Sequence, residues 1–197
     1  MLNKLYVFLI LGLLFFIYSC NQDSSDSNED LVKRYKNELN SMIIHSYDEI
    51  VIENDYISDS VFVVNTKFDT LNFKDLLGDK PKVFFHYSDK ECSACLQVQF
   101  ELLKQFQDSL GSENVIILAN VSSLRQPSVV FRQFKLRFPI YQIINHGLLT
   151  MTQVEIRNPY YFISSKDNII KNVHIPDKGF PELTMHYFRT IIYRRLI

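Results

Sequence analysis

The sequence predicts an α/β domain built on a mixed β-sheet, and three observations support this fold class. Stretches with the composition of strands alternate with stretches of helical period along the chain. Residues 115–121 form an almost wholly apolar run between polar residues, which is typical of a strand buried on both faces. Residues 160–164 and 169–175 flank the turn Lys166-Asp167-Asn168, a pattern that predicts a β-hairpin near the end of the domain.

Apolar side chains three, four or seven residues apart identify the helices, and runs of β-branched and aromatic residues identify the strands. Gly111 supplies a stop for the helix that precedes it, and Pro127 and Pro181 lie near the starts of later helices. In chain order we expect a helix at 31–46, strands at 49–57 and 61–64, a hairpin or short helix at 68–77, a strand at 82–87, a helix at 96–110, a strand at 115–121, a helix at 127–137, a strand at 139–144, a short helix at 148–156, the hairpin at 160–175 and a last helix from 181.

Residues 1–19 have the features of an export signal. Lys4 precedes a continuous apolar run at 5–17, which is long enough for the core of a signal peptide and short for a membrane span. The run ends in Ile17-Tyr18-Ser19-Cys20, which resembles a bacterial lipobox and implies cleavage before Cys20 and lipidation of that residue. An uncleaved N-terminal anchor is the alternative. Both interpretations predict an exported domain tethered to a membrane of the bacterial cell envelope, on the periplasmic or outer-surface side.

The remaining chain divides into three parts by composition. Residues 20–30 are polar and acidic, and we expect them to form a solvated tether. Residues 31–59 form an N-terminal extension, and residues 60–197 are long enough for one domain with a sizeable core. The whole chain has 21 basic and 22 acidic residues. Because no basic face with interleaved aromatic residues emerges, the sequence predicts no nucleic-acid partner.

The segment Cys92-Ser93-Ala94-Cys95 lies between a predicted strand and a predicted helix, the context that makes a CxxC pair a redox motif. At a helix N-terminus, unpaired N–H groups and the positive end of the helix dipole stabilise a thiolate at Cys92. Cys95 would lie one turn further along the same face, with α-carbons roughly 5–6 Å apart and within disulfide range. We therefore expect Cys92 to attack a substrate disulfide and Cys95 to resolve the mixed disulfide.

Two other interpretations of the CxxC pair are a zinc half-site and two inert core cysteines. A structural zinc site needs four ligands, and the sequence contains neither a second CxxC nor a close pair of histidines. The chain has three cysteines, so lipidation of Cys20 leaves this one pair. The redox interpretation needs no metal and no cofactor.

Three segments carry a family resemblance: residues 83–87 before the CxxC pair, residues 71–81 before those, and residues 158–164. Together they resemble the thioredoxin fold, and within it the TlpA-like branch of membrane-tethered thiol–disulfide oxidoreductases. The resemblance covers roughly residues 60–197 and implies a three-layer fold, with helices on both sides of the mixed sheet. It also implies that Pro159 is a cis-proline beside the cysteines and that Asn158 offers backbone groups to a substrate chain. An ordinary trans proline at the start of a strand is the alternative.

The chain departs from this family at two positions near the motif. The family usually has Trp before the first cysteine, whereas this chain has Glu91 and no Trp at all. An ionised Glu91 close to Cys92 would disfavour the thiolate. Where thioredoxins bury an acidic residue, the chain has His86, which is able to accept or relay a proton of Cys95. A core histidine that needs only one hydrogen-bond partner is the alternative.

The sequence thus predicts an enzyme, a lipid-anchored thiol–disulfide oxidoreductase that acts on the thiols and disulfides of exported proteins. The alternatives are a metal-handling lipoprotein, with copper as the metal, and a non-catalytic binding lipoprotein on the same fold. Because the inner pair Ser93-Ala94 carries no charge, we expect a reductase or isomerase rather than a strong oxidant. Such a protein needs a membrane-bound electron donor as a partner.

Overall fold

The computed structural model describes residues 23–91, 93–123, 125–144 and 159–196. The chain divides into two compact units, Met1–Ile44 and His45–Ile197, and the division lies within helix α2. None of the described helices is both long and apolar enough to cross a membrane. The elements, in chain order, are α2 (Asp23–Ile52), β1 (Phe62–Asn65), β2 (Thr70–Asn72), the 3₁₀-helix η1 (Phe73–Leu76), β3 (Lys82–Ser88), α3 (Ser93–Leu110), β4 (Val115–Asn120), α4 (Arg125–Phe134), β5 (Ile140–Ile143), β6 (Tyr160–Ser164), β7 (Lys171–His174), α5 (Pro181–Tyr187), the π-helix η2 (Phe188–Ile192) and α6 (Tyr193–Leu196).

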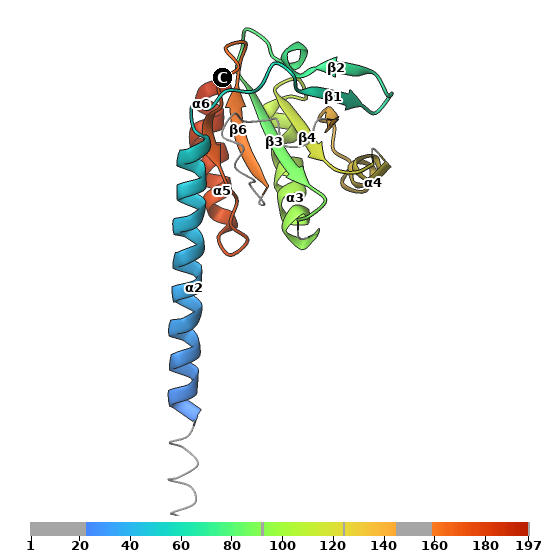
Figure 1. Cartoon of the computed structure of the whole chain (residues 1–197). Helices are drawn as coiled ribbons and strands as arrows, with labels where there is room; N and C mark the ends of the chain where they lie inside the picture. The colour runs from blue at the N-terminus through green and yellow to red at the C-terminus, as the bar shows by residue number, and fades with distance from the viewer. Residues whose placement is uncertain (1–22, 92, 124, 145–158, 197) are drawn as a thin grey trace, which may run out of the picture. The chain divides into compact units, whose positions relative to one another are not determined.

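In the described part of the chain, seven strands form one mixed sheet in the order β2-β1-β5-β4-β3-β6-β7 (Figure 1). Strand β4 pairs in parallel with β3 and β5, and the remaining pairs are antiparallel. Strands β3 and β4 lie at the centre and are buried on both faces, which explains their almost continuous apolar sequences. The predicted mixed sheet and the predicted buried strand at 115–121 are confirmed.

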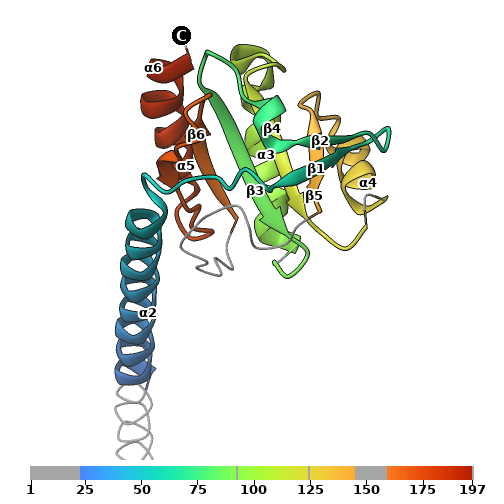
Figure 2. The ribbon, with the colours of Figure 1, turned by 45° about the horizontal axis from the view of Figure 1, so that its top comes forward.

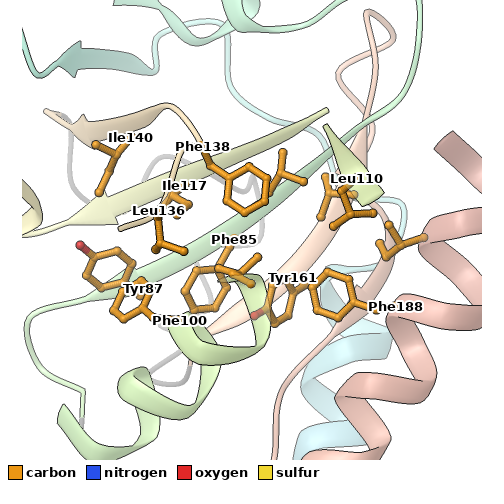
Figure 3. Packing of buried hydrophobic residues seen from close by; sticks show 14 of the residues in the cluster. Phe85, Tyr87, Phe100, Leu110, Ile117, Leu136, Phe138, Ile140, Tyr161 and Phe188 are labelled. Carbon is orange, nitrogen blue, oxygen red and sulfur yellow. The ribbon is translucent and has the colours of Figure 1, made fainter. Parts of the chain in front are cut away.

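One face of the sheet packs against α3 and the C-terminal helices, and aromatic rings dominate this contact (Figure 3). The ring of Phe85 stacks on Tyr161 at 4.5 Å between centroids, and Tyr161 meets the edge of Phe188 at 5.1 Å. Phe100 of α3 lies edge-on to Phe85. The hydroxyl of Tyr161 donates a hydrogen bond of 3.1 Å to Gln99 Oε1, so this buried polar pair is satisfied.

The opposite face of the sheet is covered by η1 and by the chain that follows α2 (Figure 2). Phe84 packs between Phe73 and Phe162, with ring centroids 5.2 Å and 5.0 Å away. Ile52 at the end of α2 and Ile57 after it are also fully buried in this cluster. The folded unit therefore includes the end of α2.

Most predicted elements are confirmed within the few residues by which element boundaries usually vary. The observed α2 is longer than the predicted helix at 31–46, and it includes acidic residues that were expected to form a tether. The predicted strand at 49–57 is wrong, because α2 continues to Ile52 and the chain then turns at Asn54, where φ is 69°. Only Tyr56 forms a bridge, to Ile169. The predicted helix at 148–156 and the export signal lie outside the described residues.

Two glutamates from the end of α2 accept hydrogen bonds from backbone N–H groups of the edge strand β7 and of the residue that follows it. The carboxylate of Glu53 accepts hydrogen bonds from the backbone N–H groups of Asn172 and Val173, both at 2.9 Å. Glu49 accepts from the N–H of Ile175 at 2.7 Å. We call Glu49 and Glu53 the carboxylate clamp. It satisfies backbone donors that would otherwise be available for pairing with another strand.

Glu53→Ala removes the acceptor for two of these donors. We expect a loss of about 1–3 kcal/mol in the free energy of unfolding, the usual cost of leaving partly buried donors without partners. Urea denaturation measures this loss, and amide hydrogen exchange should become faster at Asn172 and Val173. Glu38→Ala, in the same helix but outside the clamp, is the matched control. Equal stabilities of the two variants would show that the clamp contributes nothing.

Candidate active site

The elements predicted on either side of the CxxC pair are confirmed. Strand β3 ends at Ser88, and α3 begins at Ser93. Cys92 directly precedes α3 in the sequence but lies outside the described residues. Cys95 lies in the first turn of α3 and is partly exposed. The second cysteine therefore occupies a helix start at the end of a buried central strand, where N–H groups favour a negative charge.

The start of β6 lies at the same edge of the sheet as the motif. Strands β3 and β6 are antiparallel, with His86 opposite Tyr160, so β6 begins where β3 ends. Pro159 directly precedes Tyr160 and is buried. Asn158 lies outside the described residues, and so does the peptide bond that joins it to Pro159. The cis conformation of this bond and the substrate-binding role of Asn158 remain predictions.

Glu91, directly before the motif, has a buried carboxyl group. Its Oε1 accepts a hydrogen bond of 2.9 Å from the backbone N–H of Ser88. Among the described residues, its Oε2 is buried without a hydrogen-bond partner. Burial raises the pKa of Glu91 to about 8, and the hydrogen bonds from Ser88 offset only part of this shift. Glu91 therefore carries a proton at neutral pH, and the negative charge considered from the sequence appears only in alkaline solution.

Two tyrosines lie near this carboxyl group. Burial raises the pKa values of Tyr87 and Tyr160, and the charge of ionised Glu91 raises them further. Among the described residues, the hydroxyl of Tyr87 is also buried without a hydrogen-bond partner. Glu91 therefore interacts electrostatically with side chains from two strands, β3 and β6, while burial is the main cause of its raised pKa.

His86 faces away from α3. Its ring packs against Tyr160 at 4.7 Å, on the side of the sheet that holds Phe84, whereas Phe85 and α3 lie on the other side. This agrees with the alternation expected from the sequence. Burial lowers the pKa of His86 to about 4, so the imidazole is neutral at neutral pH. Among the described residues its Nδ1 has no hydrogen-bond partner. Its role as a proton relay remains a prediction, and the geometry favours Glu91 as the titrating group on the motif side.

Asp89 fixes the connection that carries the motif, a role that the sequence did not reveal. Its Oδ2 accepts a hydrogen bond of 3.1 Å from the N–H of Ser122, and its own N–H donates to the carbonyl of Asn120 at 3.3 Å. Both partners lie at the end of β4, the parallel neighbour of β3. The only sequence signal is that Asp89 and Ser122 each follow a buried strand, and parallel strands end at the same edge.

A mixed sheet in which a central strand leads into α3, with a proline directly before the adjacent antiparallel strand, is typical of the thioredoxin-like fold. No protein-family model matches the chain, and no curated protein matches its sequence.

Solved structures do match the fold. A candidate electron transfer protein from Aquifex aeolicus VF5 superimposes with a TM-score of 0.54 at 12% identity, covering 70% of this chain and 92% of its own. A candidate thiol:disulfide interchange protein DsbE from Chlorobium tepidum gives 0.52 at 13% identity, with 74% and 98% covered. An uncharacterised thioredoxin-like protein from Porphyromonas gingivalis gives 0.51 at 16% identity, with 72% and 95% covered. At these identities the matches show the fold, and the chain has a thioredoxin-like fold.

Glu91→Gln tests the burial of this carboxyl through the pH dependence of stability. Unfolding lowers the pKa of Glu91 from about 8 to its ordinary value of 4.5. Between these values the unfolded chain binds fewer protons than the folded one, so this group makes the free energy of unfolding fall as pH rises. Gln has no proton to lose, and we expect the variant to lack that fall.

Urea unfolding of the variant and the wild type across this range measures the difference. The contribution of His86, which has the opposite sign below pH 6.5, cancels in the comparison. Glu101→Gln, at an exposed position of α3, is the control. Parallel pH profiles for wild type and Glu91→Gln would show that Glu91 titrates as an ordinary carboxyl group.

Proposed function

We propose that this chain is a lipid-anchored thiol–disulfide oxidoreductase of the bacterial cell envelope. It would reduce or isomerise disulfides of exported proteins through Cys92 and Cys95. The observation that supports the proposal most directly is the position of Cys95 in the first turn of α3, which follows the end of β3 in a thioredoxin-like sheet. The export signal and Cys20 supply the anchor in this proposal.

The proposed reaction uses the two thiols in turn. The Cys92 thiolate attacks one sulfur of a substrate disulfide, the substrate S–S bond breaks, and the other substrate sulfur leaves as a thiolate that takes up a proton. Cys95 then loses its proton and attacks the Cys92 sulfur, which releases the second substrate thiol. The substrate gains two electrons, and the chain is left with a Cys92–Cys95 disulfide. A membrane-bound dithiol donor returns the two electrons and restores both thiols.

The electrostatics at the motif support a reductase or isomerase. A strong oxidant stabilises its reduced form through a thiolate of very low pKa. Here the residues between the cysteines are uncharged, and Glu91 is neutral near pH 7 because of its raised pKa. The helix terminus favours the thiolate, so we expect a thiol that is reactive without being exceptionally acidic.

Cys95→Ser should trap a mixed disulfide between Cys92 and a substrate such as insulin, because the resolving thiol is missing. Cys92→Ser should trap none, and both variants should lose catalytic insulin reduction. Non-reducing gels and mass spectrometry identify the linked cysteine. If Cys92→Ser trapped the mixed disulfide through Cys95 instead, the two cysteines would have the opposite roles. If the wild type did not reduce insulin, the proposed function would be wrong.

We expect a redox potential of roughly −200 to −270 mV for the Cys92–Cys95 couple, nearer to thioredoxin than to the periplasmic oxidants. Equilibration in glutathione buffers, followed by alkylation of free thiols, measures it. A value above about −150 mV would instead identify a disulfide donor.

The copper-handling alternative gains no support from the described residues, among which no group of three His, Cys, Asp or Glu side chains is placed to hold a metal ion. Insulin reduction with and without added copper separates the two functions. A redox enzyme turns over without copper, whereas a metal carrier would bind copper stoichiometrically and fail to reduce insulin.

A further inference from the structure

The part of helix α2 that lies in the first unit carries a stripe of apolar side chains that the helix itself exposes. Its members lie between Leu31 and Ile43 and are 37–66% exposed. Exposed apolar surface gathered in one place is uncommon on a soluble protein and marks an interaction site. The stripe consists of Leu31, Val32, Tyr35, Leu39, Met42 and Ile43.

The stripe has the geometry of an amphipathic helix. At 3.6 residues per turn its six side chains fall within about 120° of the helix circumference, and Asn37 lies about 180° from their centre. Residues 31–44 contain three basic residues, Lys33, Arg34 and Lys36, and one acidic residue, Glu38. A broad apolar face beside basic residues is the pattern of a helix that lies in the interface of a membrane.

A second copy of the chain fits the stripe less well. A two-stranded coiled coil needs apolar residues at the a and d positions over three or four heptads. In the register that places Val32, Tyr35, Leu39 and Met42 at a and d positions, the apolar pattern lasts for two heptads. The next a and d positions hold the polar residues Ser46 and Glu49. Glu49 is also engaged by the N–H of Ile175 in the carboxylate clamp.

The short distance along the chain from Cys20 to the stripe indicates that the stripe binds a membrane. Helix α2 begins at Asp23, three residues after Cys20, and Leu31 follows about 12 Å further along the helix axis. We propose that residues 31–44 of α2 bind the bilayer surface through the apolar stripe, so that this part of the helix lies along the membrane beside the anchor. The inference rests on the proposed lipid anchor and deepens it by adding a second contact with the same membrane.

Tryptophan fluorescence tests the proposal without background, because the chain contains no Trp. Leu39→Trp places the probe on the stripe, and Asn37→Trp places it on the opposite, exposed face as the matched control. Both full-length variants are reconstituted in vesicles of phosphatidylcholine and phosphatidylglycerol, with and without brominated phosphatidylcholine. We expect a blue shift and a loss of fluorescence to the brominated lipid for Leu39→Trp, and neither for Asn37→Trp.

Each other outcome overturns the proposal in a distinguishable way. A blue shift without quenching means that protein, either a second copy or another part of the chain, covers the stripe. Quenching of both probes means that the helix is immersed on all sides. If the protein floats with the vesicles but neither probe is quenched, the stripe does not bind the bilayer, while the proposed lipid anchor still holds. Protein that does not float refutes both, while insulin reduction reports separately on the thiol chemistry. Cys20→Ala shows in the same flotation assay whether the anchor depends on lipidation.

Discussion

The burial of strand β3 on both faces is the constraint on which the rest of the fold depends. Its neighbours β4 and β6 occupy its backbone groups on either side, and separate aromatic clusters around Phe84 and Phe85 cover its two faces. A strand enclosed in this way cannot slip by one residue without moving every side chain to the wrong face. Its last residue, Ser88, is therefore a fixed point, and the connection to α3 starts from it.

Two polar side chains near Ser88 have fewer hydrogen bonds, among the described residues, than their burial would favour. Glu91 and Tyr87 each keep a buried polar atom that finds no partner among the described residues, and such an atom typically costs about 1–3 kcal/mol. Natural sequences mostly tolerate costs of this kind at functional sites, where shifted pKa values are useful. Glu91, directly before Cys92 in the sequence, has such a shifted pKa.

The fold was largely predictable because its signals are local, whereas the details of the site come from distant contacts. The composition of residues 115–121 and of residues 160–175 is enough to predict the buried strand and the hairpin. Ile50-Val51-Ile52 resembles a strand for the same reason, but burial of Ile52 in the core stabilises the helix instead and overrides the weak β propensity. The pKa of Tyr160 depends partly on Glu91, and the partners of Glu53 also lie far along the chain. No sequence pattern links such pairs.

One device recurs around the sheet with different consequences. Carboxyl groups accept hydrogen bonds from backbone N–H groups in the clamp at β7, in the Asp89–Ser122 contact and in the Glu91–Ser88 contact. The carboxylate clamp occupies backbone donors at the edge strand β7, and the Asp89–Ser122 contact holds the connection after β3. The third is enclosed, so burial outweighs the hydrogen bond and holds the pKa of Glu91 near 8.

An unperturbed thiol also titrates near 8.5. If Cys92 acts as proposed, its proton and that of Glu91 are lost over the same pH range, and the first negative charge opposes the second when the two groups are close. The helix terminus favours the charge on the thiol, because N–H groups at a helix start stabilise an anion there, whereas the apolar surroundings of Glu91 disfavour a charge on the carboxyl. With a buried Glu91 directly before it in the sequence, a Cys92 thiolate would meet no negative charge from Glu91 at neutral pH and would be disfavoured by that charge in alkaline solution.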